Sequence, residues 1–453
     1  MTRVDRGVVS CGLLVLLVLL RFRAALDFGF FWDDFNFMFP LREWSFLSYD
    51  HYWRPLWTLF LSLQYTVFGV APLAFHAVSL ALHTANALLA WLLLRRLGAS
   101  AFVSLAVVSF WVLMGGNAYA AVWVSECNDL LAMCAILLAT HVWLSACRRQ
   151  AAWLFALSCV LWVVSMMAKE VCLLWPLFAL LLAAPGGDPS VEKRAWTRAS
   201  RVVAALLLAT ALAVYLGLRV YARGGDVVFS QGSAVTSDNQ LAGVSWPVLL
   251  LGRIAHYTEG LFYQIAPLDL FDSLAGAAFG IILGLGFVFW SVWLLFRQRH
   301  TDRARLAPLG LAAGWTVLFS IHAAVVPEAR TLYIPTLGTS ALAIGVLSIV
   351  LGTASARQRR FGGILLAVVL AMHIHLGENV KAKFESRSTP VLASHVALLD
   401  RGGDTLAPDV RRYVEHELEF ADRQGLRAYR AEARSEWRLL VRRLFNFLLG
   451  RRT

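Results

Sequence analysis

Two adjacent carboxylates, Asp33 and Asp34, lie in a segment rich in phenylalanine and tryptophan (FGFFWDDFNFMFPLREW, 28–44) that follows a long apolar stretch. A carboxylate at such a boundary can take a proton from a hydroxyl group as a general base. A pair of carboxylates can also bind a divalent cation, and an acid at a helix end can simply accept backbone N–H groups. The residue types leave all three uses open, so the surrounding elements must distinguish them.

Other ionisable side chains flank further apolar stretches, and such groups are candidates for function because charge near a membrane is costly. These further candidates are Asp27, Arg54, Glu126, Asp129, Lys169, Glu170, Arg253, Glu259, Glu328 and Arg330. A helical stripe adds four polar residues at spacings of three, four and three, which share one helix face: His76, Ser79, His83 and Asn86. Histidines on a membrane helix also commonly bond to a neighbouring helix.

The elements that must position these residues are membrane-spanning helices. Of the 453 residues 59% are hydrophobic and 15% charged, and the mean hydropathy is +0.63. Many windows of about 20 residues carry almost no charge, which suits a helix that crosses a bilayer. We predict an all-α integral membrane protein of about eleven transmembrane helices, the first of them an uncleaved span, near residues 7–22, 73–94, 101–120, 129–147, 151–167, 171–184, 202–221, 274–296, 309–326, 336–353 and 362–378.

Basic clusters follow alternate spans and predict the orientation. They lie at 95–96, 148–149, 193–201, 297–305 and 357–360. With the N-terminus in the cytoplasm, all the candidate residues fall on the extracytoplasmic face. This distribution suits one outward-opening cavity, whereas a pore needs polar residues at every depth.

Two further segments are predicted to lie at the membrane surface. Trp53 and Trp57 flank Arg54 and Pro55, which indicates an interfacial helix in the long first extracytoplasmic loop. The stretch 247–268 is interpreted as a re-entrant or interfacial helix.

The chain is predicted to divide into a transmembrane domain, residues 1–378, and a charged helical extracytoplasmic tail, residues 379–453. The last part of the tail, EWRLLVRRLFNFLLGRRT, is a basic amphipathic helix of the kind that lies on a membrane. The net charge of +12 comes mostly from loops and tail, so we expect no nucleic-acid partner. The six cysteines have no metal-ligand spacing and are interpreted as packing residues.

Six motifs follow one another from residue 30 to about 340: FWDDF, YWRPL, FGVAPLAFHAVSLALHTANALLAWLLLRRL, AAVWVSECNDLLAM, MMAKEVCLLWPLFALLL and PEARTLYIPTLG. Their order and sidedness resemble the GT-C superfamily of polytopic glycosyltransferases, and within it the protein O-mannosyltransferase-like branch. The resemblance implies transfer of a sugar from a polyprenyl-phosphate carrier to a hydroxyl acceptor on a lipid, glycan or protein. The Arg-rich, Ala-rich composition and short loops indicate a bacterial inner membrane, with the active site extracytoplasmic.

The resemblance also implies roles for individual residues. One acid of the first-loop pair is the catalytic base, with Asp33 narrowly favoured over Asp34. A leaving phosphate needs nearby cations, for which Lys169 and Arg330 are expected, with Arg54 and Arg253 in reserve. The remaining substrate-binding candidates are His76, His83, Glu126, Asp129, Glu170, Glu328 and Tyr333. The residues identify no certain cofactor, and a divalent cation at the acid pair stays open.

Three alternatives remain at this point. Lys169 and Glu170, like Glu328 and Arg330, could merely neutralise one another at the ends of spans. The protein could be a transporter of lipid-linked sugars, which would favour an inverted repeat and charged groups at mid-depth, and the sequence shows no internal repeat. It could also be a membrane scaffold without catalytic activity. The pair Cys127-Asn128 stands where relatives often place a basic residue before Asp129, a departure that concerns the substrate more than the fold.

Overall fold

The computed structural model describes most of the predicted membrane domain. Its described residues are 3–30, 34, 53–69, 71–183, 198–222, 303–323 and 333–353, together with residues 363, 367, 370, 371, 373–375 and 378–382. Every regular element among them is helical, which confirms the all-α class. Outside the described residues lie the helices predicted at 247–268 and 274–296, the tail beyond residue 382, and the candidates Asp33, Arg253, Glu259, Glu328 and Arg330.

The described helices follow the predicted spans closely. In chain order they are α1 (Arg3–Phe22), η1 (Arg23–Asp27), α3 (Pro55–Phe68), α4 (Pro72–Arg96), α5 (Ala101–Leu113), α6 (Asn117–Val122), η3 (Val124–Glu126), α7 (Cys127–Arg149), α8 (Ala152–Ala168), η4 (Glu170–Leu174), α9 (Trp175–Ala183), α10 (Arg198–Ala222), α14 (Arg303–Ala323) and α15 (Pro335–Thr353). Within the described residues, four stretches are long and apolar enough to cross a membrane, namely Gly7–Asp27, Pro72–Arg96, Val124–Arg149 and Ala199–Ala222, and five apolar helices beside them are shorter. The structure thus supports an integral membrane protein, and the total of about eleven spans stays a prediction.

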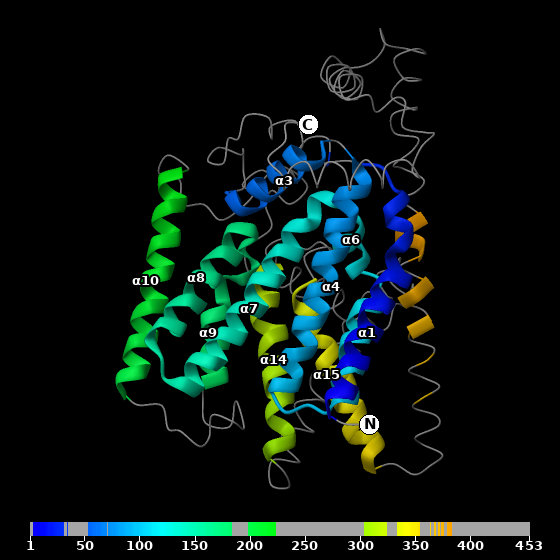
Figure 1. Cartoon of the computed structure of the whole chain (residues 1–453). Coiled ribbons are helices and arrows are strands. Elements are labelled where there is room, and N and C mark those ends of the chain that lie inside the picture. The colour runs from blue at the N-terminus through cyan, green and yellow to red at the C-terminus, as the bar shows by residue number, and fades with distance from the viewer. Residues whose placement is uncertain are drawn as a thin grey trace, which may run out of the picture.

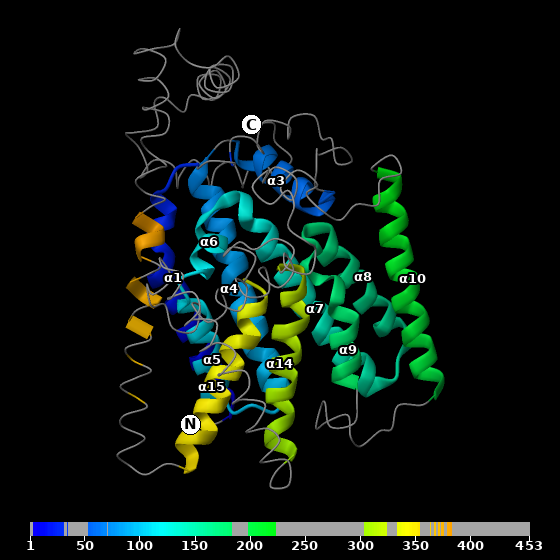
Figure 2. The same ribbon diagram turned by 180° about the vertical axis from the view of Figure 1, so that it is seen from behind.

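The helices form one bundle with α3 laid across one end. Figures 1 and 2 show α1 at one edge, α10 at the opposite edge, and α4 and α7 between them. Helix α7 is central and packs on both α4 and α8, whereas α3 contacts α4, α7 and α8. Helix α3 begins at Pro55, as expected for the helix predicted from Trp53 and Trp57.

The predicted span 101–120 is wrong as a single helix. Helix α5 ends at Leu113, because Met114 takes φ −57° and ψ 126° and cannot continue it. The side-chain amide of Asn117 donates to the carbonyl of Trp111 at 2.6 Å, which satisfies one of the carbonyl groups left over at the helix end. The chain turns at Gly115 and Gly116 and continues as the short helix α6.

Two tryptophans with bonded indole N–H groups, Trp143 and Trp175, are buried between α7 and α9. Trp143 donates to the carbonyl of Ala179 at 2.8 Å, and Trp175 donates to the Thr140 hydroxyl at 3.0 Å. Their rings meet edge to face, with centroids 5.7 Å apart. Because no water is available in a bilayer, such internal partners are required, and they tie α7 firmly to α9.

Basic pairs mark one end of the bundle and the site candidates the other. Arg95 and Arg96 end α4, and Arg148 and Arg149 end α7. His76 of α4 and the acids of α7 lie toward the starts of these helices, whereas His83 and Asn86 lie near the middle of α4. Helix α8 runs back beside α7 (Figure 1), and Lys169, which follows α8, pairs with Asp129 at the start of α7. This segregation agrees with the predicted topology, while the assignment of each end to a side of the membrane stays a prediction.

The segment after α15 packs against α1. Arg21 forms an ion pair with Glu378 and donates to the carbonyl of Ile374 at 3.1 Å. Lys381 donates in turn to the carbonyl of Arg21 at 3.1 Å. Lys381 therefore packs with the membrane bundle, although it lies just beyond the domain boundary predicted after residue 378.

Candidate active site

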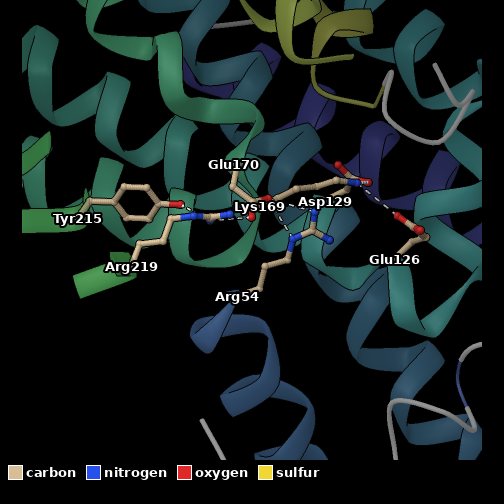
Figure 3. A network of polar contacts seen from close by, with 7 residues as sticks. All are labelled: Arg54, Glu126, Asp129, Lys169, Glu170, Tyr215 and Arg219. Carbon is tan, nitrogen blue, oxygen red and sulfur yellow. Dashed lines mark hydrogen bonds and ion pairs between the residues drawn. The ribbon is translucent and has the colours of Figure 1, made fainter. Parts of the chain in front are cut away.

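A break between α8 and η4 positions two adjacent charged residues. Helix α8 ends at Ala168, and Lys169 is extended, with φ −159° and ψ 135°, before the 3₁₀ helix η4 starts at Glu170. In an extended residue pair, successive side chains point to opposite sides. Lys169 and Glu170 therefore face different partners, as Figure 3 shows, and the structure records no ion pair between the two.

Lys169 pairs with two carboxylates of the neighbouring helix. Its Nζ atom donates to Asp129 Oδ2 at 2.5 Å and lies 3.4 Å from Glu126 Oε2. The side chains of Lys169 and Asp129 are 5% and 1% exposed, so the pair is shielded from water. Both acids lie at the start of α7, where the positive end of the helix dipole also favours negative charge.

Glu170 receives two guanidinium groups. Arg54, at the N-cap of α3, places Nη2 3.0 Å and Nε 3.1 Å from Glu170 Oε2. Arg219, in the last turn of α10, donates to Glu170 Oε1 at 3.0 Å and to the Tyr215 hydroxyl at 3.2 Å. The Tyr215 ring packs on Trp53, with centroids 5.6 Å apart. One carboxylate thereby joins α3, η4 and α10, three elements far apart in sequence (Figure 3).

The contribution of these ion pairs to stability depends on the cost of burying their charges. Burying charges costs several kcal/mol per ion, and only well-placed partners offset that cost. Removing one partner of such a buried pair costs about 3–5 kcal/mol, because the other charge is left uncompensated. The network therefore fixes the relative positions of the elements that carry it, and a substitution of any single member should destabilise the fold.

Asp34, one acid of the first-loop pair, reaches the same region. Its Oδ1 atom accepts a hydrogen bond from the backbone N–H of Ser125 at 2.7 Å, and the residue is 2% exposed. Ser125 immediately precedes Glu126, so Asp34 lies beside the acids at the start of α7.

The polar stripe of α4 faces the bundle interior, as its spacing predicts. His76 lies 3.4 Å from the carbonyl of Gly29, which holds the first loop against α4. His83 Nδ1 lies 2.6 Å from the Tyr333 hydroxyl, and both residues are fully buried. Burial raises the pKa of Tyr333 well above its ordinary value; a hydrogen bond from Asn86 lowers it and the charge of Asp129 raises it further. The Tyr333 phenol is therefore protonated at neutral pH.

The structure brings together one compact part of the predicted set. The predicted members joined by ion pairs are Arg54, Glu126, Asp129, Lys169 and Glu170. The sequence analysis missed Arg219 and Tyr215, since both fall inside the predicted span 202–221. An arginine within an apolar helix was the available signal. In the described part of the chain, no group of three His, Cys, Asp or Glu side chains lies close enough to hold a metal ion.

The arrangement of the helices is similar to that of a known membrane protein. The chain folds like an oligosaccharyltransferase. The match is to the Archaeoglobus fulgidus enzyme, whose crystal structure holds a disulfide-tethered acceptor peptide with an NVT sequon, at a TM-score of 0.50 and 13% identity. It covers 91% of this chain and 59% of that chain, so this chain spans less than two thirds of the neighbour's length. No protein-family model and no curated protein matches the sequence.

Proposed function

We propose that this protein is a membrane glycosyltransferase of the GT-C type, which moves a sugar from a polyprenyl-phosphate carrier to a hydroxyl acceptor. The fold neighbour is itself a membrane glycosyltransferase of this type. The observation that carries the proposal is that a first-loop acid, Asp34, lies beside the acids at the start of α7. The ion pairs of this region draw in cations from the α8–η4 link, the N-cap of α3 and the last turn of α10.

In the proposed reaction the acceptor oxygen forms a bond to the anomeric carbon of the sugar. The carboxylate of Asp33 or Asp34 takes the hydroxyl proton. The bond between the anomeric carbon and the phosphate oxygen breaks, and polyprenyl phosphate leaves with the electron pair. A single displacement of this kind inverts the anomeric configuration. We keep Asp33 as the favoured base, because Asp34 already holds the loop against Ser125.

The leaving phosphate gains negative charge and needs cations at the place where that charge develops. Guanidinium groups suit this task, because their planar donors match phosphate oxygens in pairs. Arg54 and Arg219, which are held together on Glu170, are the best described candidates. Lys169 is a weaker one than the sequence suggested, since it already contacts two carboxylates. Arg253 and Arg330 keep their proposed roles.

We further propose a bacterial inner membrane, an extracytoplasmic active site and an N-terminus in the cytoplasm. The donor lipid would lie in the bilayer and the acceptor would arrive from water, so a site at one end of the bundle is where they can meet. A transporter needs charged groups along a path between the two faces. The described ion-pair network (Figure 3) instead links the N-cap of α3, the start of α7, the α8–η4 link and the last turn of α10.

The test is sugar transfer by membranes that contain the wild type, Asp33→Asn or Asp34→Asn, with radiolabelled polyprenyl-phosphate sugars as donors. Label is followed into lipid, glycan and protein fractions. Asp27→Asn is the matched control, because Asp27 is an exposed acid of the same loop. We expect one loop variant to melt in detergent like the wild type and yet transfer no sugar, while the control stays active. Equal behaviour of all four proteins with every donor would refute the proposal and favour the transporter or scaffold alternative.

A further inference from the structure

A second buried polar cluster, separate from the ion pairs, surrounds the start of α15. Tyr333 lies two residues before that helix, and its hydroxyl is hydrogen-bonded to Nδ1 of His83 of α4 at 2.6 Å. The backbone carbonyl of Tyr333 accepts the indole N–H of Trp111 of α5 at 3.2 Å and the hydroxyl of Thr336 at 2.8 Å. The residue is therefore fixed at both its side chain and its main chain, by two helices more than 200 positions away in sequence.

Asn86 extends this cluster to α7. Its side-chain amide donates to the Tyr333 hydroxyl at 3.4 Å and to the backbone carbonyl of Leu130 at 2.9 Å. Leu130 directly follows Asp129, whose carboxylate binds Lys169. A continuous line of contacts thus runs from α15, through one turn of α4, to the first turn of α7.

Satisfying buried polar groups does not by itself explain this arrangement. A phenol and an imidazole need partners in a bundle core, but two apolar residues would avoid that need altogether. The line of contacts also ends at the ion pairs, because the turn of α7 that Asn86 contacts carries Asp129 and immediately follows Glu126. Among the described residues, His83 Nε2 and Asn86 Oδ1 are buried without a hydrogen-bond partner. These two atoms carry a desolvation cost, which stabilisation of the fold alone does not explain.

We propose that Tyr333, His83 and Asn86 are positioning residues that hold the first turn of α7, and with it the Asp129–Lys169 pair, in the geometry the reaction requires. The kinetic part of this inference rests on the proposed function. It replaces the direct substrate contact expected of His83 and Tyr333 from the sequence. A displacement of about 1 Å at a reacting centre can cost roughly a hundredfold in rate, so even a small shift of this turn matters.

Hydrogen exchange tests the positioning without any need for activity. The full-length protein in detergent is compared as wild type, Tyr333→Phe and Asn86→Leu, and the exchange of backbone amides is followed by mass spectrometry in the peptide covering residues 127–136. Losing one net hydrogen bond should speed local opening there by about fivefold. Ser340→Ala is the matched control, because its buried hydroxyl contacts the Met114 sulfur at 3.3 Å and neither α4 nor α7.

Kinetics on the same proteins tests the consequence. We expect Tyr333→Phe to lower kcat by about tenfold or more with KM for the donor unchanged, and to have almost no further effect in an Asp129→Asn background, as coupled sites do. Unchanged exchange at 127–136 in both variants, or a response equal to that of Ser340→Ala, overturns the inference whatever the activity. Faster exchange with full kcat overturns its kinetic part. Faster exchange in a protein that transfers no sugar with any donor supports the positioning and sinks the proposed function instead.

Discussion

Removal of the Lys169 ammonium group should destabilise the fold more than any other single charge deletion in the described network. At an effective dielectric constant of about 20, attraction across 2.5 Å to Asp129 amounts to about 7 kcal/mol, and across 3.4 Å to Glu126 to about 5 kcal/mol. Much of this attraction offsets the cost of burying three charges. Lys169→Met leaves two buried carboxylates without their cation, and we expect the free energy of unfolding to fall by about 3–5 kcal/mol.

The assay is titration with sodium dodecyl sulfate in mixed micelles, followed by tryptophan fluorescence. The decisive comparison is the triple variant Lys169→Met/Glu126→Gln/Asp129→Asn, which removes all three charges together. It should recover most of the lost stability, because whole buried ion pairs are often replaced at little cost. Arg149→Met, at the exposed end of α7, serves as the control and should change stability by less than about 0.5 kcal/mol. If the triple variant is as unstable as Lys169→Met, the reasoning from charge pairing is wrong.

Two further predictions concern packing. In Gly338→Ala the new Cβ atom would lie 2.7 Å from the carbonyl oxygen of Ala312 and 2.5 Å from the Thr316 hydroxyl, so the unfolding free energy should drop by about 1–3 kcal/mol. Gly310→Ala is the control, because its Cβ atom would meet nothing within 4 Å and should not lower the unfolding free energy. Equal losses in the two variants would contradict the packing argument. In Arg21→Gln the segment around Glu378 loses its ion pair, so limited proteolysis should cut there faster than in the wild type, and an unchanged cleavage rate would show that other contacts hold it.

The helices were predictable because nearby residues in the sequence mark their ends. Apolar stretches of about 20 residues stop at basic pairs, so α4 and α7 were placed to within a few residues from sequence alone. The prediction of a single helix at 101–120 was wrong because the helix ends within a continuous apolar stretch. There a Gly-Gly pair and the Asn117 amide end α5, although the hydropathy continues to favour a helix.

The partners of the site residues were harder to predict. From the sequence, Lys169 was expected to be a cation for the leaving phosphate, with neutralisation by its neighbour Glu170 left open as an alternative. The direction of their side chains depends on the backbone conformation at one residue, which composition does not encode. Arg219 was overlooked because it lies inside an apolar helix, and its partner Glu170 is 49 positions away. The contact of His83 with Tyr333 joins residues 250 positions apart, and only the packed bundle makes it visible.

The extended conformation of Lys169 has a consequence for how this chain can vary. At a helix, adding one residue rotates all later side chains by about a quarter turn, and packing can absorb part of the change. At an extended link, one added residue exchanges the two sides completely. A single insertion or deletion at the α8–η4 link would turn the ammonium group toward the arginines and the carboxylate toward the acids. Lys169 would then repel the two arginines, and Glu170 would repel Glu126 and Asp129. We therefore expect insertions and deletions to be tolerated less well at this link than in the other connections of the bundle.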